Sequence, residues 1–248
     1  MRYYKTMDLG RYGDIGKRVY NNLRKFVKGK KPTEQIFNLL TPTSLNKELQ
    51  SIMPGLSAKV FRTYNASVTL EQQLPELDPG MSIDEKVLEY NRANREVSIL
   101  CNHQRSVAKG FADQIGKMQK ELELFESQVK DLESWLKKAK KGADVPVKDT
   151  SKAYHAKKTS ELTDDQKWKR MSERHMFAKA PSSEQIADRL AQYLTRLEKH
   201  KLKMKNKDEN KAVALNTAKI NYMDPRITVA WCKKVELPIE KVFATTLR

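Results

Sequence analysis

Residues 111–140 read FADQIGKMQKELELFESQVKDLESWLKKAK, and the spacing of their apolar side chains decides the fold. These side chains recur at alternating steps of four and three residues: Phe111, Ile115, Met118, Leu122, Phe125, Val129, Leu132 and Leu136. Such a seam, sustained over several heptads, is typical of a coiled coil. Lysines and Gly142 follow it, as expected at the end of a helix. The stretch therefore predicts a long helix that needs a partner helix.

A second seam of the same spacing lies further along the chain. Ser182 and Gln185 form a predicted capping box at its start. Its seam positions are Ile186, Leu190, Tyr193, Leu197, His200 and Met204.

The two seams predict an antiparallel hairpin whose arms are on the order of 40 Å long, at 1.5 Å per residue. The register follows from pairing Leu136 with Ile186, which also pairs Leu132 with Leu190, Val129 with Tyr193 and Phe125 with Leu197. Residues 142–180 would form a polar tip with one short helix, from Thr163 to about Phe177. Pairing between two chains is the alternative. Because both seams lie in one chain with a tip between them, we favour a hairpin within a monomer.

Four shorter helices are predicted before the hairpin, over about residues 14–28, 45–53, 57–64 and 82–100. The last begins with a capping box from Ser82 to Glu85. The first carries its apolar side chains on one face: Val19, Leu23, Phe26 and Val27. We expect the residues up to about 105 to form a compact helical layer.

The predicted fold class is therefore all-α, in three parts. Residues 1–106 form a helical part of a catalytic core, residues 107–210 a coiled-coil hairpin, and residues 211–248 a small helical C-terminal domain. An antiparallel hairpin returns the chain to the place where it left. The same register continued past the base puts position 103 opposite about 219, so we expect His103 and Tyr222 to be neighbours.

Charge indicates the kind of partner. The chain has 248 residues, with 48 Lys and Arg against 31 Asp and Glu, a net charge of +17 and a pI of about 9.7. This excess favours a polyanion, with nucleic acid first and an anionic membrane surface second. Many solvated lysines on an otherwise ordinary protein is the alternative. No apolar run approaches the roughly 20 residues of a membrane span, so we expect no membrane partner.

Three side chains could carry chemistry together. Alone, Tyr222 would be read as a packing residue, His103 as structural and Arg62 as half of a buried ion pair. Together, a tyrosine oxygen can attack a phosphodiester while an arginine and a histidine balance the phosphate charge. No acidic cluster for Mg²⁺ and no glycine-rich phosphate loop is evident, so we expect no cofactor and no metal.

Long motifs around these three residues carry a family resemblance. They are KVFRTYNAS (59–67), YNRANREVSILCNHQR (90–105), TAKINYMDPRITVAWCKK (217–234) and LPIEKVF (237–243), with RYY at 2–4. They closely resemble the eukaryotic type IB DNA topoisomerases. The resemblance covers nearly the whole chain and is weakest between about 107 and 205, where that family has a variable coiled-coil linker.

The resemblance implies a function for the site. Tyr222 matches the nucleophile that forms a 3′-phosphotyrosyl bond, and Arg62 and His103 match two residues that bind the phosphate. Such an enzyme relaxes supercoiled double-stranded DNA without ATP by nicking and resealing one strand, in the nucleus. The resemblance also implies DNA contacts, at Asn221, Lys219, Lys59, Asn102 and Gln104.

The chain also departs from the family pattern. That family has a further catalytic arginine and lysine upstream of the match to RYY, and Lys5 does not align with that lysine. Ala218 replaces a serine that is not the nucleophile. We therefore expect a C-terminal fragment that is weak or inactive alone and needs the upstream portion of the same enzyme to complete its site. Two alternatives stay open: a non-catalytic DNA-binding adaptor whose coiled coil recruits partners, and a tyrosine recombinase.

Overall fold

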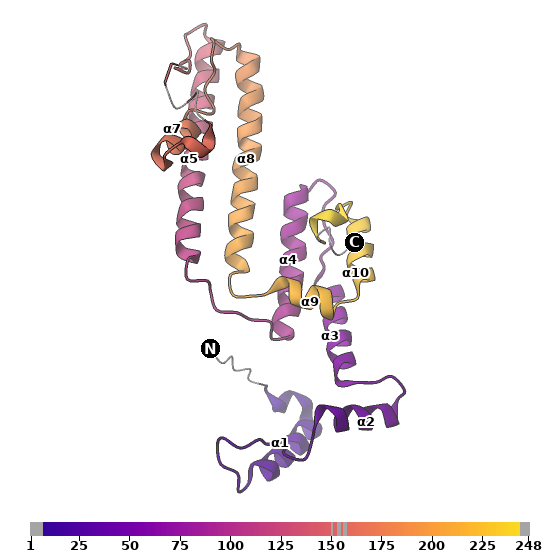
Figure 1. Ribbon diagram of the computed structural model, residues 1–248. Coiled ribbons are helices and arrows are strands. Elements are labelled where there is room, and N and C mark those ends of the chain that lie inside the picture. Colours follow the sequence, from indigo (N-terminus) through magenta and orange to yellow (C-terminus); the bar gives the residue numbers. More distant parts are fainter. Residues whose placement is uncertain (1–6, 150, 153–154, 156–157, 244–248) are drawn as a thin grey trace. The chain divides into compact units, whose positions relative to one another are not determined.

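The computed structural model describes residues 7–149, 151–152, 155 and 158–243 (Figure 1). The RYY motif at 2–4 and Lys5 lie outside the described residues. The described part contains helices and no strand, and its isolated bridges join Gln104 to Val213 and Val147 to Phe177. The predicted all-α fold is confirmed. No helix among the described residues is long and apolar enough to cross a membrane.

The chain divides into two compact units. One unit combines residues 1–106 with 212–248, so segments from before and after the other unit fold together. The other unit is the single stretch Val107–Lys211.

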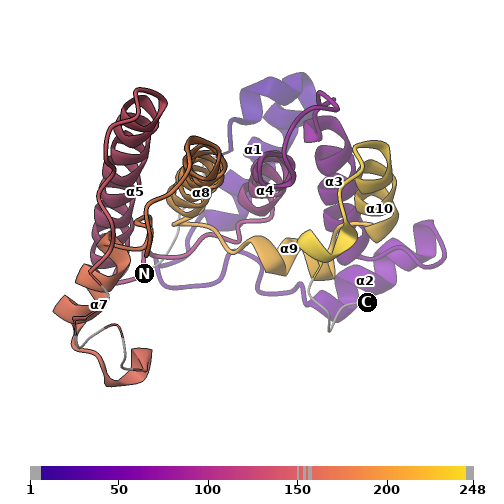
Figure 2. The ribbon, with the colours of Figure 1, turned by 90° about the horizontal axis from the view of Figure 1, so that it is seen from above.

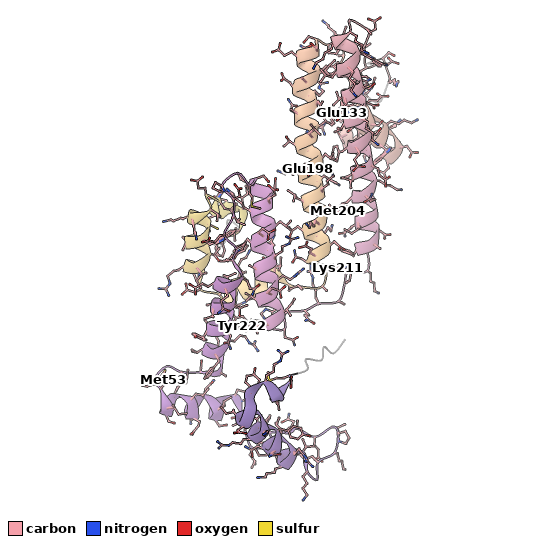
Figure 3. The ribbon with its side chains drawn as sticks, turned by 180° about the vertical axis from the view of Figure 1, so that it is seen from behind. Met53, Glu133, Glu198, Met204, Lys211 and Tyr222 are labelled. Carbon is pink, nitrogen blue, oxygen red and sulfur yellow. The ribbon has the colours of Figure 1, made fainter. Side chains whose placement is uncertain are left out.

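The second unit is the predicted hairpin. Helices α5 (Phe111–Lys140) and α8 (Ser183–Glu209) lie side by side in Figures 1 and 2. Their shared core contains residues from both predicted seams: Leu122, Val129, Leu132, Ile186, Tyr193 and Leu197. Nε2 of His200 donates to the Met118 carbonyl (2.8 Å), and the His200 ring lies 5.5 Å from that of Phe125. His200 thus faces the turn between Met118 and Phe125, as the predicted register requires. In Figure 3 Met204 lies between the two helices.

Both capping predictions for the hairpin hold. The Ser182 hydroxyl accepts from the backbone of Gln185, whose side chain accepts from the Ser182 backbone, which satisfies free N–H groups at the start of α8. Gly142, with φ +71°, follows the end of α5 in the left-handed conformation that glycine adopts without strain.

The tip is less polar than predicted. The 3₁₀ turn η2 (Thr159–Glu161) leads to α7 (Asp164–Ser172), which is shorter than the predicted helix. The buried Gln128 amide of α5 donates to the carbonyls of Met171 and Ser172. Phe177 is buried in the hairpin core. Part of the tip therefore packs against α5.

In the first unit, η1 (Leu9–Tyr12), α1 (Gly13–Val27) and α2 (Pro42–Ile52) bury little. The predicted apolar face of α1 is largely exposed, with Val19 at 41% and Phe26 at 47%. The expectation of one compact layer up to residue 105 is therefore wrong for these helices. An amphipathic pattern predicts that the apolar face of a helix packs against other residues, but the described residues leave this face largely exposed.

The core of this unit is built from α3 (Ala58–Gln73), α4 (Ile83–Leu100), α9 (Leu215–Asn221) and α10 (Pro225–Lys234). One cluster packs α3 and α4 against α9: Ala66, Leu70, Ala93, Val97, Cys101, Ala218 and Met223. A second packs Tyr90 of α4 against Trp231 of α10 and against the chain around η3 (Ile239–Lys241). Figure 2 shows α9 crossing beside α4 and α10 beside α3.

Candidate active site

Tyr222 ends α9 and lies beside α3 (Figure 3). Its backbone N–H donates to the Ala218 carbonyl (3.0 Å), while Met223, the next residue, is buried in the core. The phenol is half-buried and packs partly against the α3–α4–α9 cluster. Burial of Ala218 and Met223 therefore anchors the backbone on both sides of the phenol.

Arg62 reaches Tyr222 from α3. Its Nη1 donates to the Tyr222 Oη at 3.4 Å, and its guanidinium carbon lies 5.2 Å from the ring centroid. The side chain remains exposed, so its other N–H groups are accessible to a ligand. A guanidinium in this position can hold phosphate oxygens and stabilise negative charge on the phenol oxygen.

His103 reaches Tyr222 from the end of α4. The two rings stack with centroids 5.5 Å apart and planes inclined by 27°. Nδ1 of His103 is buried without a hydrogen-bond partner, so Nε2 is the nitrogen that a ligand can reach. Burial lowers the pKa of the imidazole below its usual value, and the positive charge of Arg62 lowers it further. Both effects favour the neutral form of the imidazole.

The turn before His103 sets the direction of its side chain. Asn102 has a φ of +58°, a left-handed conformation that asparagine tolerates better than other non-glycine residues. The Asn102 N–H donates to the Ile99 carbonyl and the His103 N–H to the Ser98 carbonyl. This is a Schellman motif, in which the positive φ at Asn102 ends α4 and reverses the chain.

Two backbone hydrogen bonds tie this turn to the approach to α9. The Ala214 N–H donates to the His103 carbonyl and the Arg105 N–H to the Ala212 carbonyl, each at 2.9 Å. Together with the stacking of the two rings, these hydrogen bonds confirm the expectation that His103 and Tyr222 are neighbours although more than a hundred residues separate them.

The five expected DNA contacts have different surroundings. Lys59, Asn102, Gln104 and Asn221 are exposed, and the Lys59 Nζ lies 5.9 Å from the Tyr222 ring centroid. Lys219 points elsewhere. Its Nζ donates to the Val242 carbonyl (2.6 Å) and lies 5.5 Å from the Phe243 ring, and burial lowers its pKa.

Four polar residues that support the site were not singled out by the sequence. The buried Asn94 amide of α4 donates to the Leu215 carbonyl at 3.1 Å. The Ser67 hydroxyl of α3 accepts from the Asp224 N–H at 3.0 Å. The Tyr90 and Thr228 hydroxyls share a buried hydrogen bond of 3.0 Å between α4 and α10. Each of them lies inside a quoted motif, but no pattern of spacing distinguishes them from neighbouring polar residues.

The described residues contain no group of three or more His, Cys, Asp or Glu side chains that could hold a metal ion. The groups that converge at the site are a phenol, a guanidinium and an imidazole. Such a set suits a tetrahedral or pentavalent phosphorus that carries negative charge.

Comparison with known proteins identifies the family. A family model described as eukaryotic DNA topoisomerase I, catalytic core, matches residues 1–136, and one described as C-terminal topoisomerase domain matches residues 194–248. DNA topoisomerase 1 of Caenorhabditis elegans is 43% identical over 235 residues, which are 94% of this chain and 24% of that protein. DNA topoisomerase 1 of Homo sapiens is 41% identical over 249 residues, which are 100% of this chain and 28% of that protein.

A mitochondrial DNA topoisomerase I of Rattus norvegicus is 41% identical over 235 residues, 94% of this chain and 35% of that protein. The chain thus spans about a quarter to a third of the length of these relatives. The family expected from the motifs is confirmed: the chain belongs to the eukaryotic DNA topoisomerase I family.

Proposed function

We propose that this chain takes part in relaxing supercoiled double-stranded DNA by transient cleavage of one strand through Tyr222. The observation that carries the proposal is the convergence of Arg62 and His103 on the Tyr222 phenol, with Arg62 at hydrogen-bond distance from the reacting oxygen. Each of the three comes from a different helix or turn of one compact unit.

The proposed step exchanges one phosphodiester for another. The Tyr222 Oη forms a bond to phosphorus and its proton passes to solvent. The bond between phosphorus and the 5′-oxygen breaks, and that oxygen takes up a proton. Because the 3′-phosphotyrosyl bond is itself a phosphodiester, resealing is the reverse reaction and needs no nucleotide.

Arg62 and His103 have separate roles in this step. Arg62 binds a phosphate oxygen and its N–H stabilises the phenol oxygen as negative charge develops there. Neutral His103 donates from Nε2 to another phosphate oxygen. The resemblance implies two more groups, an arginine and a lysine, which the upstream portion of the enzyme would supply, the lysine as the acid for the 5′-oxygen.

We propose further that the chain acts as a monomer on duplex DNA in the nucleus, although a mitochondrial relative is equally similar. Residues 1–106, 107–210 and 211–248 would serve as core, linker and C-terminal domain. Lys59, Asn102, Gln104 and Asn221 are exposed around Tyr222 and would contact the DNA strand. The net charge of +17 supports a polyanionic partner.

Plasmid relaxation tests the proposal. The chain is assayed alone and with the upstream residues of the C. elegans relative supplied as a second polypeptide, without ATP and with EDTA. We expect relaxation in the mixture, and its loss on Tyr222→Phe. Tyr20→Phe, at an exposed tyrosine of α1, is the matched control and should relax normally.

The same assay decides between the alternatives. Salt-sensitive duplex binding with no relaxation and no covalent adduct in any mixture would replace this proposal with the DNA-binding adaptor. Strand exchange between two duplexes would favour the recombinase. Retained relaxation by Tyr222→Phe would remove Tyr222 from the mechanism.

A further inference from the structure

The helix that carries Tyr222 is held in place by other parts of the unit. Helix α9 has 7 residues, about two turns, and an isolated helix of that length is not stable in water. Its beginning is held by α4, through the Asn94 amide on the Leu215 carbonyl and the His103 carbonyl on the Ala214 N–H. Tyr222 lies at the C-terminal end of α9, so the position of the phenol depends on the contacts that hold that end.

The other end of α9 is the turn from Tyr222 to Asp224. The Asp224 carboxylate caps α10, since it accepts from the backbone and the guanidinium of Arg226, and these hydrogen bonds lower its pKa to about 2. The Asp224 backbone N–H has a different partner, since it donates to the Ser67 hydroxyl of α3 at 3.0 Å. Two residues after the phenol, the chain is thus fastened to α3.

Ser67 and Arg62 lie in the same helix. They are five positions apart, about 7.5 Å along the axis, and both are inside α3 (Ala58–Gln73). A hydrogen bond from Asp224 to Ser67 therefore sets the position of the Tyr222 turn relative to the helix that presents Arg62.

We propose that Ser67 is a positioning residue, whose hydroxyl fixes the Tyr222 oxygen within reach of the Arg62 guanidinium and of the phosphate that it binds. This inference rests on the proposed function, because it assigns Ser67 to the same cleavage step. Burial of Ala218 and Met223 holds the backbone on both sides of the phenol but sets no direction, whereas the hydrogen bond from Asp224 to Ser67 does. Without that hydrogen bond the turn can rotate and the phenol can shift while the apolar burial keeps α9 in place.

Three variants test the proposal. Ser67→Ala removes the acceptor, and Ser67→Thr keeps a hydroxyl at the same position. Ser51→Ala is the matched control, because the Ser51 hydroxyl of α2 is exposed and donates to the Glu48 carbonyl of its own helix. Each is made in the full chain and assayed with the upstream polypeptide described above.

Two readouts are independent of activity. Hydrogen exchange of the Asp224 amide reports the hydrogen bond, and the NMR shifts of the Tyr222 ring report its stacking on His103. Ser67→Ala should accelerate the exchange and shift the ring resonances, while Ser67→Thr and Ser51→Ala should match the parent chain. Unchanged Tyr222 resonances in Ser67→Ala would overturn the proposal, whether or not the protein cleaves DNA.

The third readout is single-turnover formation of the phosphotyrosyl adduct on a nicked DNA duplex. Ser67→Ala should slow it about 10- to 100-fold, because a displacement on the order of 1 Å has that effect on a positioned reaction. Duplex affinity and thermal midpoint should stay near those of the parent, and Ser67→Thr should restore most of the rate. A rate loss matched by weaker DNA binding, or not rescued by threonine, would contradict positioning.

The outcomes separate the two proposals. If the parent mixture forms no adduct but Ser67→Ala still displaces the Tyr222 ring, the proposed function fails and the positioning contact stands. If the parent forms the adduct and Ser67→Ala forms it equally fast, the function stands and the role of Ser67 is refuted.

Discussion

Each of the two units is stabilised internally by a different kind of contact. The hairpin packs a repeating apolar seam, in which Leu132 and Ile186 are fully buried. The candidate active site is assembled by directional hydrogen bonds between residues far apart in sequence, such as Ser67 with Asp224 and His103 with Ala214. Apolar burial is tolerant of direction, whereas a hydrogen bond is not. Substitutions in the hairpin should therefore change stability, and substitutions at the site should change chemistry.

Apart from Tyr222→Phe, which should abolish the adduct, the largest effect should come from Arg62→Ala. Loss of a charged donor at the phosphate should slow single-turnover adduct formation by about 10³-fold, near 4 kcal/mol of transition-state stabilisation. The thermal midpoint should not change, because Arg62 is exposed. Arg18→Ala, at an exposed arginine of α1, is the control. A loss of less than tenfold would show that Arg62 does not hold the phosphate.

The hairpin provides the converse test. Leu132→Ala should lower the free energy of unfolding by about 2–5 kcal/mol, because it removes a fully buried leucine. Urea unfolding followed by Trp135 fluorescence measures this change. Glu133→Ala, at the exposed neighbouring position, should stay within about 0.5 kcal/mol of the parent. If Leu132→Ala also slowed adduct formation under conditions where the hairpin is folded, the separation of roles would be wrong.

Acidification should weaken the hairpin through His175. This imidazole is buried, stacks on Trp135 at 4.9 Å and lies 3.2 Å from the Asp131 carboxylate, with Arg189 and Tyr193 of α8 also nearby. Burial lowers its pKa and outweighs the opposing effect of Asp131.

The sign of the pH effect follows from that shift. The unfolded chain binds a proton at His175 at a higher pH than the folded chain does, so stability falls as the pH drops from about 7 through 6.5 and on to the folded pKa. Urea midpoints measured between pH 7.5 and 5 should decrease, and His175→Gln should decrease less. An equal decrease in the parent and in His175→Gln would assign the effect to other groups.

The smallest effects are expected from substitution of Lys59 and Lys219, the two lysines that the motifs place near Tyr222. Lys59 is exposed, so Lys59→Met should weaken duplex binding and reduce the slope of log affinity against log salt by about one. Lys219 is engaged with the Val242 carbonyl, so Lys219→Met should leave that slope unchanged and cost about 0.5–1.5 kcal/mol of stability. A reduced salt slope in Lys219→Met would contradict this prediction and show that Lys219 contacts DNA, as the motif implies.

Periodicity made the hairpin predictable, because Leu132 and Ile186 belong to two repeats of the same spacing that lie in one chain with a tip between them. The meeting of His103 with Tyr222 was predictable for the same reason, since an antiparallel pair returns the chain to its origin. The exposure of Val19 and Phe26 could not be predicted, because an apolar helix face does not show which other residues cover it. The roles of Ser67 and Asn94 could not be predicted, because both side chains form hydrogen bonds with backbone groups of distant segments. Every residue except proline has the same backbone groups, so the sequence does not indicate which of them is the partner.

The central claim is that Tyr222, Arg62 and His103 act on one phosphate. The most direct test traps the covalent complex on a nicked duplex, digests it, and maps the attached nucleotide by mass spectrometry. We predict a nucleotide joined through its 3′-phosphate to the peptide that contains Tyr222, with no adduct in Tyr222→Phe and a greatly reduced yield in Arg62→Ala. An adduct on any other residue, or full yield in Arg62→Ala, would contradict the claim.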